Sequence, residues 1–587
     1  MSTYNDASLI YYPSGYKASK AYSLKPTDGS GDLTFTRAST ATRVNEQGLI
    51  EGVRTNLILQ SNTFSDASWN KVAQGVGSVS VVTPNYTTDP FGGNNAWRFQ
   101  CNLNGGTTSN DRSWMLQSFT PIANSILSIY IKLNVAGSKT IILSNGGGNV
   151  QTITSTDWVR INIATSGSSG QFRIGLIGNA TSDTLDCSIA FAQAEVSDFG
   201  ATEYIPTTTT AVSVGMLANV PRIDYTGGGC GKLLLEPQRT NLIKNSANVG
   251  AGFVVGNITL VLNNAAAPNG LVEADKFYPT TSGGNRWFYQ AVTTSASSTI
   301  SVFAKADGKD ILYISSGAST DVSFDLSSGL VTYERSGWVG SIEDFGDGWY
   351  RCIAVKSSSV VFAAYGVADS SGGNSVTASG TDGILVWGMQ CESSATYPTS
   401  YIPTSGTAVT RVADASVTTG LSSVIGQTEG VFYVEIAALA NDNSGRYISI
   451  SNSTNNNRII IGFETTSDRI YVYVTSGGAS QVSMFYEVSD ILNFNKVAFK
   501  YKVNDFSLWV NGVERATDII GILPTSLTSI TFNSGGGGNI FYGKVQNVMI
   551  FPTVLTDDDL TLLTGTLGET YFESYALMAN YLNYTIQ

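Results

Sequence analysis

Tryptophan and arginine residues at matched places in the chain are the side chains best suited to holding a ligand. Arg112 precedes Trp114 by two residues, Arg286 directly precedes Trp287, and both pairs follow a polar loop that contains Gly and Asn. An indole ring offers a large flat face for stacking against a sugar ring. We therefore regard Trp114, Trp287, Arg112 and Arg286 as candidate carbohydrate-binding residues. The alternative is that equivalent tryptophans fill equivalent hydrophobic cores.

Catalytic chemistry is restricted by the complete absence of histidine. Histidine is the side chain that most often moves protons near neutral pH, so Ser-His-Asp and Cys-His mechanisms are excluded. Glycoside hydrolysis needs only two carboxylates, but no particular pair stands out among the 45 Asp and Glu residues. We predict a non-enzymatic protein without catalytic residues. The alternative is a glycan-degrading depolymerase of the carboxylate-pair type.

Metal and cofactor chemistry has little support in the sequence. Glu343, Asp344 and Asp347 share one turn and offer oxygen ligands that would suit calcium, but their spacing differs from that of an EF-hand loop. We expect a solvated turn, no metal site and no cofactor. The five cysteines are far apart, form no CxxC pair and are expected to be buried thiols: Cys101, Cys187, Cys230, Cys352 and Cys391.

The overall charge and hydropathy narrow the range of partners. The net charge is −12 and no basic block is present, so nucleic acid is not an expected partner. No stretch has the run of about 20 apolar residues that would cross a bilayer. The N-terminus also lacks the basic and apolar regions of a secretory signal. We expect a soluble protein made in a host cytoplasm, without membrane insertion.

An internal repeat predicts the architecture. Residues 54–58 and 239–243 both read Arg-Thr-Asn-Leu-Ile, and residues 204–207 and 401–404 both read Tyr-Ile-Pro-Thr. Other matches keep the same order, so the chain contains two copies of one domain. Alternation of apolar and polar residues and frequent turn signals indicate an all-β fold of tandem jelly-roll β-sandwiches. The predicted modules are jelly roll 1 at 53–212, a connector at 213–238 and jelly roll 2 at 239–410.

A third module is predicted at 411–565. Asn511-Gly512 lies between two strand-like runs, which is the strongest short-range signal for a β-hairpin. Thr556 and Asp559 have the spacing of a capping box and predict a short helix near the C-terminus that carries Leu560 and Leu563.

Two resemblances follow from these residues. The module at 411–565 resembles a concanavalin A-like or laminin G-like jelly roll, through its hairpin at 509–513 and the strand and Asp-rich turn at 544–563. The paired copies resemble the carbohydrate-binding-module-like jelly rolls of phage structural proteins, through residues 35–42 (FTRASTAT), 68–71 (SWNK) and the two repeated motifs. Residues 33–71 resemble head or tail fibre and appendage proteins of bacteriophages.

These resemblances imply a structural protein on the virion surface. We expect a fibre or capsid-decorating appendage of a phage head or tail that mediates adhesion to host-surface or mucosal glycans. Its expected partners are other virion structural proteins and copies of itself, with a homotrimer as the predicted oligomer. A bacterial cell-surface adhesin would need an export signal that the sequence lacks.

The N-terminal residues 1–52 are too short and turn-rich to build a core of their own. Leu9, Ile10, Tyr11 and Tyr12 form an apolar, strand-like run, and an unpaired strand edge tends to recruit a partner. We predict that residues 1–52 are a virion-attachment arm and that a chain lacking residues 1–35 stays folded. The alternative is that the arm folds back on the first jelly roll.

The C-terminal residues 566–587 carry a second association signal. Tyr571, Tyr575, Met578 and Leu582 are spaced like the apolar stripe of a coiled-coil helix. We predict a C-terminal helix that uses this stripe for oligomerisation. The alternative is that the helix docks on the chain's own laminin G-like module.

Overall fold

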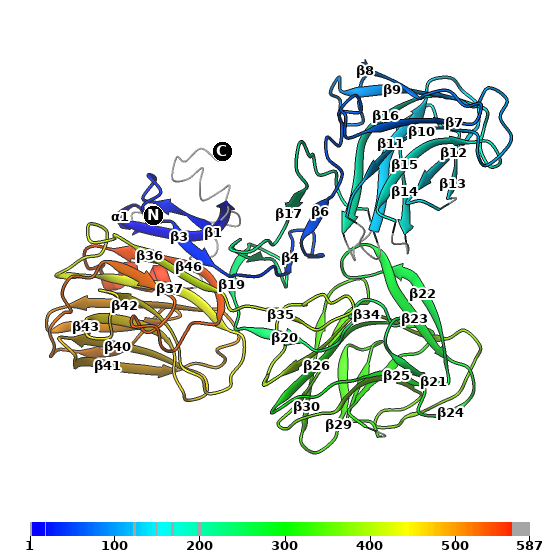
Figure 1. The fold of residues 1–587 in the computed structure, drawn as a ribbon. Helices are drawn as coiled ribbons and strands as arrows, with labels where there is room; N and C mark the ends of the chain where they lie inside the picture. Colours follow the sequence, from blue (N-terminus) through cyan, green and yellow to red (C-terminus); the bar gives the residue numbers. More distant parts are fainter. Residues whose placement is uncertain are drawn as a thin grey trace. The chain divides into compact units, whose positions relative to one another are not determined.

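The computed structural model describes residues 3–17, 19–120, 125–147, 149–165, 169–196, 201–317 and 319–565, and it is almost entirely β (Figure 1). Among these residues are two short helices, α1 (Thr3–Asp6) and α2 (Asp557–Thr564), and the strands β1 to β46. Short apolar runs that alternate with small polar residues fit a pleated strand with one face on a core. The predicted class, tandem β-sandwiches with a short helix near the C-terminus, is confirmed.

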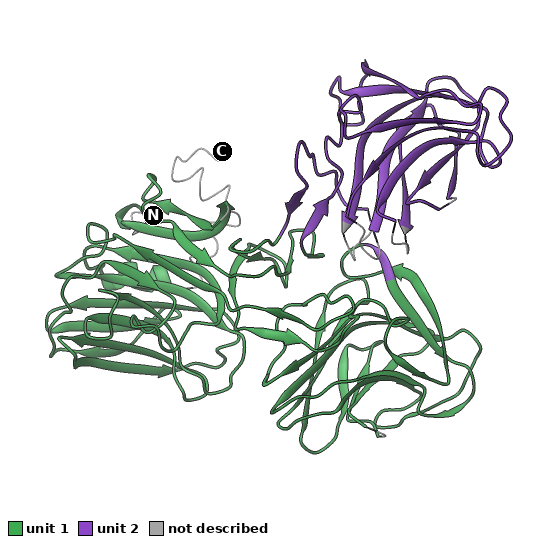
Figure 2. Ribbon diagram, in the orientation of Figure 1, with its two compact units in different colours: residues 1–52, 216–270, 274–587 green, residues 53–215, 271–273 purple. Residues whose placement is uncertain are grey.

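The chain divides into two compact units (Figure 2). One unit comprises residues 53–215 with 271–273, and the other comprises 1–52, 216–270 and 274–587. We call the sandwich of residues 53–215 the first sandwich. The other unit holds the second sandwich, built mainly from residues 239–411, and the C-terminal sandwich, built mainly from residues 415–564.

The first sandwich consists of two antiparallel sheets around one core, which includes Phe99, Met115, Ile129 and Phe172. One sheet has the order β13 (Val150–Ile153), β12 (Lys139–Ser144), β15 (Gln171–Ile177), β10 (Arg112–Ser118), β7 (Asn70–Gln74). The other has the order β14 (Val159–Thr165), β11 (Ser125–Leu133), β16 (Thr184–Val196), β6 (Arg54–Asn56), β17 (Val212–Val214), and β16 also pairs with β9 (Ala96–Asn102), which pairs with β8 (Val81–Thr87).

The second sandwich repeats this plan around a core that includes Phe277, Phe288, Phe324 and Tyr365. One sheet has the order β22 (Ile258–Ala266), β23 (Val272–Pro279), β34 (Gly383–Ser393), β26 (Ser298–Asp307), β31 (Tyr350–Lys356), β30 (Trp338–Asp344), and β20 (Arg239–Asn241) joins β34 to β35 (Val409–Arg411). The other has the order β21 (Val254–Gly256), β25 (Trp287–Ala291), β32 (Phe362–Ala368), β27 (Ile311–Ser315), β28 (Val322–Asp325), β29 (Leu330–Glu334).

The repeated sequence motifs bond to each other inside each sandwich. Asn56 of the first Arg-Thr-Asn-Leu motif donates its Nδ2 to the backbone oxygen of Ile205 at 2.8 Å, and Asn241 donates to Ile402 at 2.9 Å. Each asparagine is fully buried, and its Oδ1 accepts two backbone N–H groups at 3.1 Å. In each sandwich the asparagine of one motif thus bonds to the backbone of the other motif. A buried side-chain amide needs such hydrogen-bond partners, which accounts for the recurrence of both motifs.

The C-terminal sandwich contains strands from three distant parts of the chain. Its continuous order is β41 (Ala479–Glu487), β40 (Arg469–Ser476), β39 (Arg458–Phe463), β38 (Arg446–Ser451), β45 (Ser529–Thr531), β36 (Ala415–Thr419), β3 (Leu33–Thr36), β2 (Lys20–Lys25), β1 (Leu9–Lys17), β46 (Gly543–Phe551), β37 (Glu429–Ala438), β42 (Asn495–Lys502), β43 (Asp505–Val510), β44 (Val513–Asp518). In addition, β19 (Lys232–Leu235) pairs with β46 and with β18 (Ile223–Asp224). Two small ribbons, β4 (Arg43–Val44) with β5 (Ile50–Glu51) and β24 (Gly283–Gly284) with β33 (Ser375–Val376), complete the described strands.

The N-terminal strands are interior parts of this sandwich, which corrects the expectation of a free strand edge. Leu9, Ile10 and Tyr11 pair with β46 on one side, and Ile10 and Tyr11 pair with β2 on the other. All three are at most 1% exposed. Tyr12 is partly buried and packs against a neighbouring apolar cluster. The alternative, folding back on the first jelly roll, is also replaced, because the partner strands β36 and β46 belong to the C-terminal sandwich.

The predicted hairpin and capping box are both confirmed. Val510 pairs with Val513 around Asn511 and Gly512, which have φ values of 50° and 85°, as a type I′ turn requires. The side chain of Thr556 caps α2 by accepting the backbone N–H of Asp559 at 3.2 Å. The buried face of this helix, Leu560 and Leu563, packs in one cluster with the 5%-exposed Trp509.

The predicted C-terminal association segment lies outside the described residues. Residues 566–587, with Tyr571, Tyr575, Met578 and Leu582, are not among them, so the helix and the trimer stay predictions. Among the described residues, no helix is long and apolar enough to cross a membrane.

A buried cluster of five charged side chains joins three segments: the one after the N-terminal strands, the connector, and the one between the second and C-terminal sandwiches. Arg222 bonds to Glu236 at 2.6 Å and also to Asp414, Arg411 bonds to Glu236 at 2.6 Å, and Arg37 bonds to Asp414 at 3.1 Å. Burial alone would raise the pKa of Glu236, but Arg411 and Arg222 outweigh burial and hold that pKa well below its usual range. Burial lowers the pKa of Arg37 to about 10 against the attraction of Asp414. We call these five residues the charge cluster.

Candidate functional site

Trp114 and Trp287 occupy equivalent positions on the outer faces of their sheets. Trp114 pairs with Gly175 on the neighbouring strand, and Trp287 pairs with Gly366 in the same way. The next residue in each strand, Met115 or Phe288, points into the core. Because side chains alternate along a strand, both tryptophans face away from the core. Neither tryptophan belongs to the main apolar cluster of its sandwich, although Trp114 is itself buried.

The glycines paired with the two tryptophans lie in crowded places. A Cβ at residue 175 would lie 2.5 Å from Cα of Trp114, and a Cβ at residue 366 would overlap the ring of Tyr313. A glycine inside a strand often marks a place where another group approaches the backbone closely. In both copies glycine is thus the residue that fits, because neighbouring atoms already fill the space that a Cβ would need.

Three aromatic rings form a row on the outer face of the second sandwich. The ring centroids of Trp287 and Tyr289 are 5.6 Å apart, and those of Tyr289 and Phe362 are 5.4 Å apart. Trp287 and Tyr289 are half-buried, and Phe362 is 36% exposed. We call Trp287, Tyr289 and Phe362 the aromatic strip. The strip offers a neutral surface of rings to solvent.

Tyr313 lies two strands away from Trp287 on the same face. It pairs with Gly366, is 1% exposed, and its hydroxyl has no hydrogen-bond partner among the described residues. Burial raises the pKa of Tyr313 above its usual range, so the hydroxyl keeps its proton. Such a hydroxyl is a hydrogen-bond donor that is not used within the described residues.

The equivalent face of the first sandwich has different chemistry. Trp114 is only 4% exposed, because the guanidinium groups of Arg112 and Arg173 lie 4.9 and 5.2 Å from its ring centroid. The indole Nε1 of Trp114 is buried without a hydrogen-bond partner among the described residues. We call these three residues the Arg–Trp–Arg cluster. Here two cations cover the ring, so Trp114 offers no open face for stacking.

Arg286 does not accompany Trp287 in the way that Arg112 accompanies Trp114. Its guanidinium donates to the backbone oxygens of Thr281 at 2.8 Å and Ser282 at 2.7 Å, and these bonds stabilise the turn that precedes Trp287. Arg112 lies within its strand two residues from Trp114, whereas Arg286 lies just before the strand that begins at Trp287. The sugar-binding role of Arg286 stays a prediction.

Sequence reasoning missed Arg173 and Phe362, which come from strands paired with the tryptophan strands. The available signal was the isolated glycine in each of two apolar stretches, Gly175 within 171–177 and Gly366 within 362–368. An isolated glycine in a strand pattern indicates that another group lies close to the backbone there. It does not identify the strand from which that group comes.

Metal and thiol chemistry have no site among the described residues. No group of three or more Cys, Asp or Glu side chains there is arranged to hold a metal ion. Four cysteines are buried, Cys230 is half-buried, and none of the five forms a disulfide. Burial raises the pKa of Cys101 and of Cys391 to about 12, which keeps these thiols protonated and unreactive.

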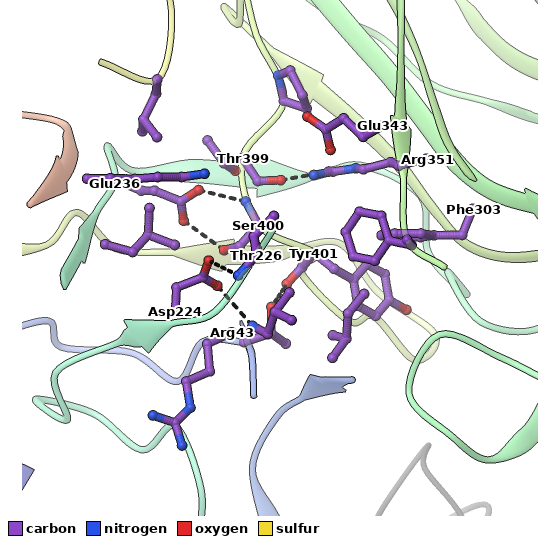
Figure 3. Close-up of a pocket in the computed structure, with 18 of the residues that line it drawn as sticks. Arg43, Asp224, Thr226, Glu236, Phe303, Glu343, Arg351, Thr399, Ser400 and Tyr401 are labelled. Atoms are coloured by element: carbon purple, nitrogen blue, oxygen red, sulfur yellow. Dashed lines mark hydrogen bonds between the residues drawn. The ribbon is translucent and has the colours of Figure 1, made fainter. Parts of the chain in front are cut away.

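A cavity of about 280 Å³ lies beside the charge cluster, in the unit that comprises residues 1–52, 216–270 and 274–587 (Figure 3). Its polar walls already bond to one another: Glu236 accepts from Ser400 N at 2.7 Å, and Arg351 donates to Thr399 O at 2.7 Å. Asp224 accepts from the backbone N–H of Val44 at 2.9 Å. These polar groups thus already have hydrogen-bond partners within the protein, although Nε of Arg351 has none among the described residues.

Comparisons with known proteins give only partial likenesses. No family model and no curated protein matches the sequence. Among solved structures, a Ruminococcus gnavus sialidase CBM40 bound to α2,3-sialyllactose shares 18% identity over 25% of this chain and 91% of its own, with a TM-score of 0.22. Domain 4 of the arabinanase AbnA from Geobacillus stearothermophilus, in complex with arabinotriose, shares 12% identity over 26% of this chain and 73% of its own, with a TM-score of 0.22. The botulinum neurotoxin serotype G binding domain shares 14% identity over 27% of this chain and 41% of its own, with a TM-score of 0.23.

Proposed function

We propose that this protein is a non-enzymatic glycan-binding protein and that the aromatic strip of the second sandwich is its principal binding surface. The observation that carries the proposal is the row of Trp287, Tyr289 and Phe362 on the outer face of a sheet, outside the core. Exposed aromatic side chains in a contiguous row are unusual on a soluble protein and mark a binding surface.

The strip suits a sugar chain for two physical reasons. The apolar face of a pyranose ring stacks on an aromatic ring. Neighbouring rings of the strip are about 5.5 Å apart and inclined by 55° and 88°, so a sugar stacked on one ring would meet the edge of the next. The unpartnered hydroxyl of Tyr313 supplies a donor for a sugar oxygen on the same face. A sugar chain lying along the strip would therefore make both apolar and polar contacts.

The biological setting is proposed from the sequence. The resemblance of residues 33–71 to phage appendage proteins supports a location on the virion surface, where the protein would contact other virion proteins and adhere to host or mucosal glycans. The absence of histidine supports a binding role over catalysis. Antibody labelling of intact phage particles would test the location, and unlabelled particles would refute it.

A binding experiment tests the strip directly. Binding of the full chain to a panel of neutral oligosaccharides, arabinotriose among them, is measured by isothermal titration calorimetry. Trp287→Ala should weaken binding by about 5- to 30-fold, since one lost stacking contact costs about 1–2 kcal/mol. Tyr278→Ala is the matched control, because Tyr278 is also half-buried but belongs to the other sheet. Equal affinities for the wild type and both variants would refute the proposal.

The depolymerase alternative has its own test. The full chain is incubated with capsular and mucosal polysaccharides, and reducing ends are counted over time. We expect no release above the blank. Release that disappears when one Asp–Glu pair is replaced would establish an enzyme instead.

A further inference from the structure

The Arg–Trp–Arg cluster holds two like charges close together. Both guanidiniums lie about 5 Å from the same ring centroid, and both side chains are half-exposed. Burial and the charge of Arg112 lower the pKa of Arg173. Two neighbouring cations repel each other unless an anion lies between them.

No carboxylate of the described residues neutralises this pair. Arg112 donates its Nε to the backbone oxygen of Ser109 at 3.0 Å, and Arg173 donates to the side-chain oxygen of Gln171. Polar side chains on the same outer face as the cluster are neutral, and they include Asn70, Gln74, Ser118 and Gln171. The face therefore carries a local positive charge on a chain whose net charge is −12.

The donors of the cluster match a carboxylated sugar. Guanidinium groups bind carboxylates through paired, charge-assisted hydrogen bonds. The surrounding amides can donate to and accept from hydroxyl groups, and the unpartnered Nε1 of Trp114 is a further donor for an oxygen. A ring that bears both hydroxyls and a carboxylate would use all of these groups at once.

We propose that the Arg–Trp–Arg cluster of the first sandwich binds the carboxylate of an acidic sugar, such as a uronic acid within a glycan chain. This inference rests on the proposed glycan-binding function and assigns a ligand class to the first sandwich. The two copies of the repeat then differ in ligand charge. The aromatic strip takes neutral sugars, and the cluster takes acidic ones, at equivalent places on the same kind of sheet.

The test uses the full chain carrying Trp287→Ala, so that the strip contributes little. Binding of tetragalacturonate, of its methyl ester and of sulfate is compared by calorimetry. The ester keeps the shape of the sugar but removes its charge. We expect tetragalacturonate to bind at least about tenfold more tightly than the ester, because a charge-assisted hydrogen bond is lost. We also expect this affinity to fall as salt rises, because the cluster is partly exposed.

Arg112→Gln and Arg173→Gln should each weaken tetragalacturonate binding by about tenfold. Lys132→Gln is the matched control: it removes one positive charge from the same sandwich, but on the opposite sheet, where Lys132 lies over Trp158. Thermal unfolding of each variant checks that the sandwich is intact. An additional Arg173→Lys variant keeps the positive charge but removes the planar guanidinium that can make two parallel hydrogen bonds. We expect Arg173→Lys to recover only part of the lost affinity.

Several outcomes would overturn this assignment. Equal binding of the ester and the acid would mean that no carboxylate is recognised. Displacement of tetragalacturonate by an equal concentration of sulfate would mean a general anion site. If Lys132→Gln weakens binding as much as the arginine variants, the effect is one of net charge only. Any of these results leaves the proposed neutral-glycan strip intact, whereas an ineffective Trp287→Ala in the neutral panel refutes the strip and not the cluster.

Discussion

At the scale of single residues, small differences set the chemistry of two equivalent positions. Trp114 and Trp287 lie on equivalent strands of the two sandwiches, and each pairs with a glycine of the neighbouring strand. The neighbours two residues away differ: Arg112 covers Trp114, whereas Tyr289 extends the row of rings beside Trp287. A strand returns to the same face every second residue, so these neighbours decide what each tryptophan presents to solvent.

Asp275 gives a pH prediction at this scale. It is buried in β23, accepts the backbone N–H groups of Val249 at 2.7 Å and Asn263 at 3.0 Å, and burial raises its pKa to about 6. Because this folded-state pKa lies above the unfolded value near 4, the contribution of Asp275 to stability is fully present below about pH 4 and is lost as the pH rises through about 6.

The comparison with Asp275→Asn isolates this effect from other titrations. As the pH falls from 7 to 4, the unfolding free energy of the wild type should rise relative to the variant by up to about 3 kcal/mol. Thermal unfolding of both proteins at several pH values measures the difference. A difference that is independent of pH would show that Asp275 titrates normally in the folded protein.

At the scale of elements, the C-terminal sandwich depends on strands from the other end of the chain. Ile10 pairs with Met549, and Leu9, Tyr11 and Phe35 belong to the same core as Phe432. The N-terminal strands thus fill a gap between β36 and β46 that the third module cannot close with its own residues.

A truncation tests this dependence. Deletion of residues 1–36 should expose the edges of β36 and β46 and leave the C-terminal sandwich unfolded or insoluble, which replaces the expectation of a folded truncated chain. Phe35→Ala is the milder change and should cost about 3–4 kcal/mol through the cavity it leaves. Tyr22→Ala, at a position 40% exposed on β2, should cost much less. Chemical denaturation monitors all three, and an unchanged midpoint for Phe35→Ala would contradict the assignment.

At the scale of the whole molecule, the charge cluster ties together three segments that are distant in the sequence. Arg37 follows the N-terminal strands, Arg222 and Glu236 lie in the connector, and Arg411 and Asp414 lie between the second and C-terminal sandwiches. Buried charges that are fully paired fix one arrangement of the segments, and removing one partner leaves an uncompensated charge.

Glu236→Gln should therefore destabilise the protein by about 3 kcal/mol, because Arg222 and Arg411 would face each other without their shared partner. Glu487→Gln is the matched control, since Glu487 pairs with Arg469 but is 65% exposed, and it should cost below about 1 kcal/mol. Differential scanning calorimetry measures both. We expect the second and C-terminal sandwiches to unfold in separate transitions in Glu236→Gln, and a single unshifted transition would contradict the role of the cluster.

The sequence alone determined the fold class and the local signals. Alternating strands, the Asn511-Gly512 turn and the Thr556 cap depend on neighbours a few residues apart, where side-chain period and turn geometry decide the outcome. The order of the repeated motifs likewise identified two equivalent sandwiches with equivalent tryptophans.

The tertiary structure alone decided which strands pair. The register that sets Trp114 over Gly175, brings Arg173 onto the same ring and inserts β1 beside β46 depends on contacts between residues far apart in the chain. Strand pairing is chosen by which faces bury together, and a shift of one residue would turn every side chain to the other face. Local sequence patterns do not determine which strands pair. The aromatic strip, the covered Trp114 and the buried N-terminal strands therefore became apparent only in the folded protein.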